Sequence, residues 1–254
     1  MHRLTLALLT LALPITAQEP VFRGSIGFSG GSYGFTSDLP EFDDSADADM
    51  FLARFEATTA GGYGGGFRFE SLTSDDTNGL FREPLNSNNP NGPLTAGTKA
   101  RNDTFQAHFT YLVRQHRFEM PVRAGLILNG LVLDEQTATT PESDYVSFGP
   151  YIEIEPEVTL LLRETVRWSA YGQFGFGVAR TDIDIDGDPR DYSSDTSFAN
   201  IELGMRVLLG PAEISVAYVG RFQSMDQSSI ESGQFVYGFE SDYQGLLLTA
   251  GVRF

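Results

Sequence analysis

The sequence contains no cysteine, only one tryptophan and only three histidines among its 254 residues. The absence of cysteine excludes a disulfide framework, a thiolate metal site and a cysteine nucleophile. Basic residues are also scarce: 17 lysines and arginines stand against 34 aspartates and glutamates, which gives a formal net charge of −17. Nucleic acid is therefore not an expected partner, because neutralising phosphates requires lysine and arginine.

Beyond its first residues the sequence also lacks an apolar run long enough to cross a bilayer as a helix. The start is different: Arg3 precedes an apolar run from Leu4 to Leu13, Pro14 ends that run, and Ala17 offers a small residue for cleavage. This pattern is typical of a secretory signal peptide, and the run is too short for a membrane anchor. We expect cleavage of residues 1–17, which leaves 254 − 17 = 237 residues as one domain, 18–254.

Alternation of apolar and polar residues with a period of two runs through the rest of the chain and predicts strands. In a membrane barrel only alternate residues face lipid, so a mean hydropathy of −0.16 is compatible with a membrane protein. Pro121 and Pro150 each remove a backbone donor inside a predicted strand, where we expect bulges. The ten predicted strands cover residues 20–35, 48–59, 63–72, 102–114, 117–133, 145–161, 166–182, 196–209, 212–225 and 242–254.

The connections between these strands alternate between short and long. Short ones lie at 60–62, 115–116, 162–165 and 210–211, and long ones near 36–47, 73–101, 134–144, 183–195 and 226–241. Outer-membrane barrels have short periplasmic turns and longer extracellular loops. A soluble two-sheet sandwich would alternate in hydrophobicity too, but it would not order its loops in this way. The sequence thus predicts an all-β, closed, antiparallel up-and-down transmembrane barrel of about ten strands, with eight or twelve as alternatives and both termini in the periplasm.

The last six residues resemble a known assembly signal. Thr249-Ala250-Gly251-Val252-Arg253-Phe254 follows the order polar, any, glycine, apolar, any, aromatic. It is similar to the terminal β-signal of Gram-negative outer-membrane barrel proteins, the OmpA-like and porin-like barrels, in which the barrel-assembly machinery reads the last strand. The resemblance implies that Thr249, Gly251, Val252 and Phe254 serve assembly, and that the partners are outer-membrane lipid and that machinery.

The predicted inward face of the barrel is densely charged. A charge on the lipid side is costly, whereas a charge in the lumen finds a partner or water. These side chains either form an ionic constriction in a narrow pore or fill the interior as a plug, and ten strands favour the plug. The predicted lumen residues are Arg23, Arg54, Glu56, Arg68, Glu70, His108, Arg114, Glu119, Arg123, Glu153, Glu155, Glu202, Arg206, Glu213, Arg221 and Arg253.

Evidence for an enzyme is weak. Apart from the signal peptide, the histidines are His108, expected inside the barrel, and His116, expected in a periplasmic turn. A ten-stranded barrel is similar in strand number to the omptin proteases, whose catalytic histidine and aspartates lie at the extracellular rim. Neither histidine is expected there, so no catalytic residues are assigned.

A possible calcium site lies in the loop that follows the seventh strand. Asp182, Asp184, Asp186 and Asp188 alternate around Gly187 like the first ligands of an EF-hand loop. Ser193 stands where the bidentate glutamate would be required, so an acidic solvated loop is the alternative reading.

The function that this sequence indicates is an outer-membrane barrel with a structural or narrow-pore role for small solutes or ions. A surface adhesion or binding protein that acts through its acidic extracellular loops is the alternative. An outer-membrane hydrolase is a third hypothesis.

Overall fold

The computed structural model describes residues 21–37, 43–75, 80–82, 94–96, 98–135, 143–185, 189–231 and 233–254. The expected signal peptide, residues 1–17, lies outside these ranges. The strands of the main sheet are β1 (Val21–Ser37), β2 (Asp43–Thr58), β3 (Tyr63–Ser74), β6 (Thr98–Gln115), β7 (Phe118–Glu135), β8 (Ser143–Ile154), β9 (Glu157–Leu162), β10 (Val166–Ile185), β11 (Tyr192–Leu209), β12 (Ala212–Met225) and β13 (Phe239–Arg253). Two short strands, β4 (Leu80–Arg82) and β5 (Leu94–Ala96), pair with each other outside that sheet.

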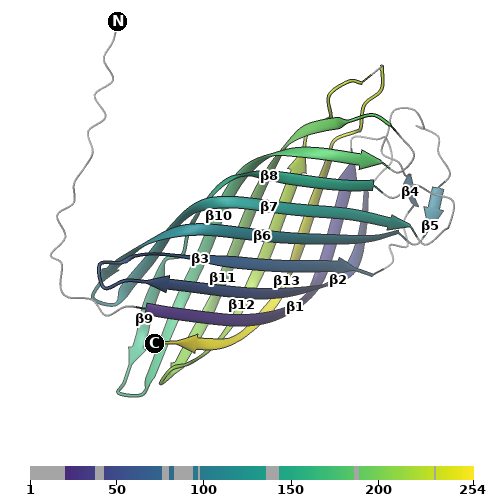
Figure 1. The fold of residues 1–254 in the computed structure, drawn as a ribbon. Helices are drawn as coiled ribbons and strands as arrows, with labels where there is room; N and C mark the ends of the chain where they lie inside the picture. The colour runs from purple at the N-terminus through teal and green to yellow at the C-terminus, as the bar shows by residue number, and fades with distance from the viewer. Residues whose placement is uncertain are drawn as a thin grey trace, which may run out of the picture.

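The main sheet closes on itself as an antiparallel barrel (Figure 1). Each strand pairs with its neighbours along the chain, and β1 pairs with β13, from Arg23 opposite Arg253 to Ser37 opposite Phe239. Because β8 and β9 both lie between β7 and β10, the eleven strands of the sheet fill ten positions. The prediction of a closed barrel of ten strands is confirmed.

Pro156 explains the division between β8 and β9. The two segments keep one register against β7, with Ile154 opposite Val122 and Val158 opposite Phe118. Pro156 has no backbone N–H, so the ladder is interrupted there, although its carbonyl still accepts a bond from Gly172 at 3.0 Å.

The expectation of bulges at Pro121 and Pro150 was wrong. Pro121 lies opposite Leu112 and Pro150 opposite Leu126 with no shift of register. The shift lies instead between Trp168 and Ser169 of β10, where β9 carries one extra residue. A proline is tolerated wherever its missing donor would not have completed a ladder bond.

The two ends of the barrel differ. At one end, which we call the turn end, lie the four tight turns at 59–62, 116–117, 163–165 and 210–211, together with the start of β1 and the end of β13 (Figure 1). At the opposite loop end several strands run beyond their predicted limits: β2 begins at Asp43, β6 at Thr98 and β10 ends at Ile185. The strands therefore project past the apolar part of the barrel.

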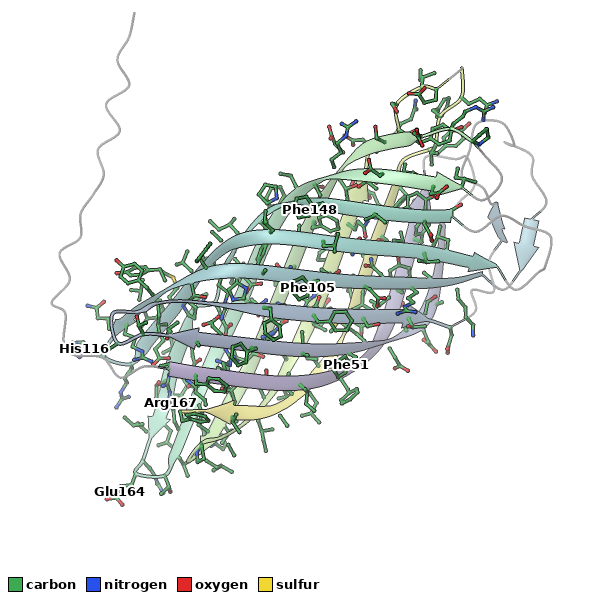
Figure 2. The ribbon with its side chains drawn as sticks, viewed as in Figure 1. Phe51, Phe105, His116, Phe148, Glu164 and Arg167 are labelled. Atoms are coloured by element: carbon green, nitrogen blue, oxygen red, sulfur yellow. The ribbon has the colours of Figure 1, made fainter. Side chains whose placement is uncertain are left out.

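The outer face of the barrel is apolar over most of its height. Phe109 is 83% exposed and Leu248 is 60% exposed, and Phe51, Phe105 and Phe148 project outward in Figure 2. A soluble sandwich would have buried Phe109 and Leu248 between its sheets. Among the described residues, no helix is long and apolar enough to cross a membrane. The exposed apolar side chains include Ile26, Phe28, Leu126, Leu128, Ile152, Phe174, Phe176, Leu203, Val216 and Leu246.

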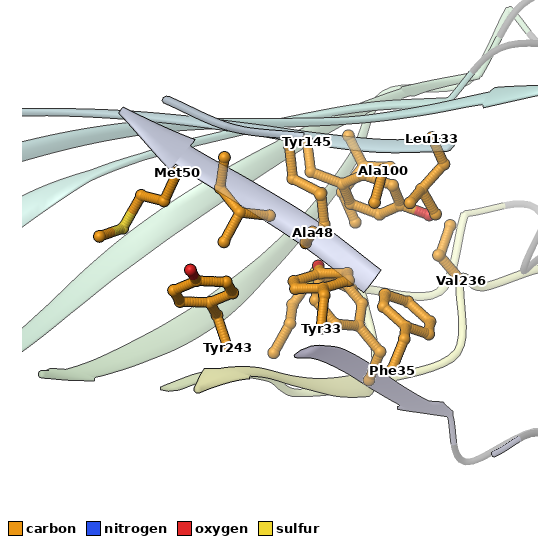
Figure 3. Packing of buried hydrophobic residues seen from close by; sticks show 14 of the residues in the cluster. Tyr33, Phe35, Ala48, Met50, Ala100, Leu133, Tyr145, Val236 and Tyr243 are labelled. Atoms are coloured by element: carbon orange, nitrogen blue, oxygen red, sulfur yellow. The ribbon is translucent and has the colours of Figure 1, made fainter. Parts of the chain in front are cut away.

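The interior is filled and changes in character along the barrel axis. Toward the loop end, buried apolar side chains form the cluster that we call the apolar plug (Figure 3). Toward the turn end, the inward positions carry arginine and glutamate. The apolar plug includes Tyr33, Phe35, Met50, Leu52, Leu131, Leu133, Tyr145, Ile183, Ile185, Tyr192, Val219, Val236, Phe239, Tyr243 and Leu247.

Candidate functional site in the barrel interior

The charged side chains meet in the barrel because each occupies an inward position of its strand. Glu153 of β8, Glu155 in the link after it and Glu157 of β9 are successive inward residues, with exposed fractions of 4%, 1% and 2%. The predicted lumen residues come from β1, β2, β3, β6, β7, β8, β11, β12 and β13, and from the link between β8 and β9, which contains Glu155. The structure brings all of those residues into one network of ion pairs and hydrogen bonds.

We call the part nearest the turn end the turn-end ion cluster. Arg206, which is 0% exposed, contacts Glu155 at 2.8 Å and Glu213 at 3.2 Å, and also pairs with Glu157. Arg23 shares two of these carboxylates, at 2.8 Å from Glu155 and 2.9 Å from Glu213. The Arg206 guanidinium also lies 4.2 Å above the centre of the Tyr171 ring, a cation–π distance.

Deeper in the barrel lies the central ion cluster, organised around Glu202 and Glu70. Glu202 is 0% exposed and accepts hydrogen bonds from Arg68 at 2.7 Å and Arg221 at 2.6 Å, and from Arg54. Glu70 accepts from Arg221 at 2.7 Å and from Arg68. A buried charge must be paired and hydrogen-bonded to be tolerated, and these groups satisfy that requirement by sharing partners.

Glu153 and Glu119 extend the network on either side. Glu153 accepts from Arg123 at 2.8 Å, Gln173 at 2.7 Å and Asn200 at 3.1 Å. Glu119, at the mouth of the turn end, pairs with Arg167 at 3.1 Å and with Arg253. Arg114 lies 3.5 Å from Glu119.

Two charged members of this network were missed in the sequence. Glu157 continues the inward series of Glu153 and Glu155, and Arg167 bonds to it at 2.8 Å. The period of two within the predicted strand 145–161 puts Glu157 on the same face as Glu153, so this signal could have identified it. Arg167 lies on the same face of β10 as the inward residues Ser169, Tyr171 and Gln173, so the alternation along this strand could have identified it.

His108 lies on the inner face of β6, remote from either rim. Its Nδ1 is 2.8 Å from the Tyr151 hydroxyl, and its Nε2 is 3.5 Å from a Glu56 carboxylate oxygen. Glu56 in turn accepts a 2.5 Å hydrogen bond from Arg123. His116 lies in a turn at the turn end with a positive φ of 52° (Figure 2).

The residues of the expected assembly signal lie at the β13–β1 seam. Thr249 faces inward, 2.6 Å from the Ser215 hydroxyl, whereas Val252 and Phe254 face outward. The Phe254 ring stacks on Phe22 at 5.0 Å, and the backbones of these two residues exchange hydrogen bonds of 2.6 and 3.0 Å. Gly251 is needed for close approach, because a Cβ there would meet the Gly24 carbonyl at 2.2 Å. Their role in assembly stays a prediction.

The proposed calcium ligands do not all lie in a loop. Asp182 and Asp184 belong to β10 and face outward, and they alternate with buried Ile183 and Ile185 because the chain is extended there. Asp186 and Asp188 lie outside the described residues. Within the residues that the structure describes, no group of three or more metal-ligating side chains gathers.

The fold and its two faces define the class of protein. A closed ten-stranded antiparallel barrel with an exposed apolar outer face, a charged interior and tight turns confined to one end is a β-barrel of the outer-membrane type. The chain therefore has the architecture of an integral membrane β-barrel.

No family model and no curated protein matches the chain. Among solved structures it is similar to the outer-membrane protease OmpT from Escherichia coli, with 11% identity, coverage of 94% of this chain and 97% of that chain, and a TM-score of 0.47. It is also similar to Ail, the attachment invasion locus protein of Yersinia pestis, with 13% identity, coverage of 93% and 100%, and a TM-score of 0.29. The β domain of the Bordetella autotransporter BrkA shows 12% identity, coverage of 91% and 99%, and a TM-score of 0.36.

Proposed function

We propose that this barrel has a structural role in the outer membrane and that its lumen is closed to ions. The observation that carries the proposal is the burial of the central and turn-end ion clusters, in which Arg206 and Glu202 are both 0% exposed. A water-filled constriction would leave such charges partly solvated. Ten strands lie near the number at which side chains fill a barrel, so a closed interior agrees with the size of the fold.

Conductance in a planar lipid bilayer tests this proposal. The purified barrel is expected to give no stepwise current at moderate voltage. Arg206→Ala is the informative variant, since it removes a cation from the filled cross-section, and Arg101→Ala is the matched control, because Arg101 is exposed at the loop end. Regular channel events from the unmodified protein would overturn the proposal in favour of the narrow pore.

The orientation that accompanies this proposal places the turn end in the periplasm and the loop end outside the cell. The native chain lacks cysteine, so single cysteines can be introduced without background. Glu164→Cys marks a turn at the turn end (Figure 2), and Gln227→Cys marks an exposed position at the loop end. A membrane-impermeant maleimide added to intact cells should label the second variant and not the first. The reverse pattern would refute the orientation.

A second candidate function, binding of a cationic surface partner, is favoured by one observation. At the loop end the outward positions of the strand extensions carry aspartates that face away from the barrel, among them Asp47, Asp49, Asp144, Asp182 and Asp184. Such a field attracts cations and basic proteins and weakens with salt. Salt-sensitive binding of intact cells to a basic matrix protein, lost on Asp→Asn substitution of this set, would support it. Binding that is unchanged by the substitutions would exclude it.

A further inference from the structure

A small internal cavity separates the central ion cluster from the apolar plug. Its volume is about 70 Å³, and its lining comes from all sides of the barrel. Glu70 and Arg221 lie at its charged side, and Met50 and Leu72 lie at its apolar side. Gly175 and Gly177 of β10 also line the cavity, and a Cβ at Gly175 would meet the Asn200 side chain at 1.8 Å.

Three buried amide side chains line this cavity with atoms that no other described residue satisfies. Gln106 and Asn129 present the acceptors Oε1 and Oδ1, and Gln223 presents the donor Nε2. The three residues are 7%, 1% and 5% exposed. The other amide atoms of two of them are anchored: Asn102 donates to Gln223 Oε1 at 3.0 Å, and Asn129 donates to Thr104 at 2.8 Å.

The geometry points to a binding site for a small uncharged molecule that carries a primary carboxamide, and we propose this as an activity of the cavity. A primary amide has two N–H donors and one carbonyl acceptor, which match the two free amide acceptors and the one free amide donor. The Tyr33 hydroxyl also lines the cavity and adds one group that can donate or accept. Its short alkyl end would contact Met50 and Leu72. A charged ligand is disfavoured, because Glu70 and Arg221 already pair at 2.7 Å and leave no counter-ion.

The volume limits the size of the ligand. A cavity needs a volume of roughly 10–15 Å³ for each water molecule that it holds. A cavity of about 70 Å³ therefore accommodates roughly five waters, or one molecule of similar bulk such as acetamide. This inference is independent of the proposed structural role, since a closed barrel and a narrow pore could both contain such a site.

Binding of acetamide to the full barrel in detergent micelles tests the site. The measurement is the side-chain ¹⁵N–¹H shift of the Gln223 amide during titration with acetamide, with acetate and acetone as comparison compounds. Saturable shifts with acetamide, none with acetate, and weaker binding of acetone, which has no N–H donor, are expected. If none of the three compounds gives a saturable shift, the cavity holds only water and the proposal is wrong.

Substitutions of residues that line the cavity test whether acetamide binds there. Gln223→Leu removes the free donor and should weaken binding about tenfold, the value of roughly one hydrogen bond. Leu72→Phe fills the apolar side and should abolish binding while it retains every amide. Phe105→Leu, a lipid-facing change next to Gln106, is the control and should leave affinity unchanged. For Gln223→Leu and Leu72→Phe, binding is followed by saturation-transfer signals from the ligand. Unchanged affinity in Leu72→Phe would show that acetamide binds elsewhere and would overturn the proposal.

Discussion

Removal of the Arg206 side chain should destabilise the barrel strongly, because its three carboxylate partners lie in a space that water does not reach. Arg206 pairs with Glu155, Glu157 and Glu213 and is 0% exposed. Breaking a buried ion pair by removing one partner costs roughly 3–5 kcal/mol. Each carboxylate keeps a second cation here, for instance Arg23 at 2.8 Å from Glu155, so the lower end of that range applies.

We therefore expect Arg206→Ala to lower the free energy of unfolding by about 3 kcal/mol. Because about 1.4 kcal/mol corresponds to a factor of ten, the equilibrium constant of unfolding should change more than a hundredfold. Arg101→Ala is the matched control. Arg101 pairs with Asp103 at 2.8 Å with its side chain 64% exposed, and such a pair contributes only about 0–1 kcal/mol. Arg206→Lys should fall between the two, since it keeps the charge and loses the fork of donors.

Unfolding in urea, with the folded fraction read from the gel mobility of unheated samples, measures these differences. The slope against urea should stay constant while the midpoint moves. A loss below about 1 kcal/mol for Arg206→Ala would refute the reasoning, because it would mean that water solvates the remaining carboxylates. In a water-filled lumen the same change would leave stability nearly unchanged and shift ion selectivity toward cations.

Three further changes test other parts of the barrel. Phe109→Arg puts a charge on the lipid face and should cost about 2–4 kcal/mol of stability if Phe109 lies near the bilayer midplane, whereas Phe109→Leu should be almost neutral. If the two variants are equally stable in lipid vesicles, this surface does not face the membrane. Val236→Ala, in the apolar plug, should cost about 1.5–3 kcal/mol by urea unfolding, and a value near zero would show that the β12–β13 connection does not pack into the barrel. Phe254→Ala removes the ring stacked on Phe22 and should lower the amount of barrel in the outer membrane without affecting export; unchanged levels on membrane fractionation would contradict the assembly signal.

The sequence predicted the strands and their faces well near the turn end. There the rule that apolar residues face lipid and polar residues face inward applies to most of β6, where Phe105, Phe109 and Tyr111 are exposed and Gln106 and Thr110 are buried. Leu112 is the exception, since it is apolar and buried. Side-chain alternation alone sufficed to assign Arg206, Glu202 and Arg221 to the interior.

The same rule failed toward the loop end because the polarity of the two faces inverts along a strand. In β10, Phe174, Phe176 and Val178 face outward, but a few residues later Ile183 and Ile185 face inward while Asp182 and Asp184 face outward. The apolar residues thus change from the outward to the inward face of the strand, and the sequence pattern alone predicts an acidic loop for this stretch. The apolar plug was missed for this reason, since a strand that leaves the bilayer must hide its apolar residues inside.

Individual partners could not be predicted from alternation. The period of two assigns Arg23 to the interior, but whether it meets Glu155 or Glu56 depends on the stagger between strands, which sets the height of each side chain in the barrel. The amide-lined cavity could not be predicted either, because its lining comes from strands all round the barrel whose relative heights depend on the same stagger.

The span of the ion pairs along the chain has a consequence for how the barrel folds. Arg23 bonds to Glu155, 132 positions away, and to Glu213, 190 positions away, while Arg54 bonds to Glu202 over 148 positions. None of these pairs can form in a partial barrel, so an open intermediate would expose unpaired charges to the hydrocarbon. Contacts between such distant residues also slow folding, because the loop must close before they form. Formation of the interior should therefore coincide with closure between β1 and β13, as one late and cooperative step.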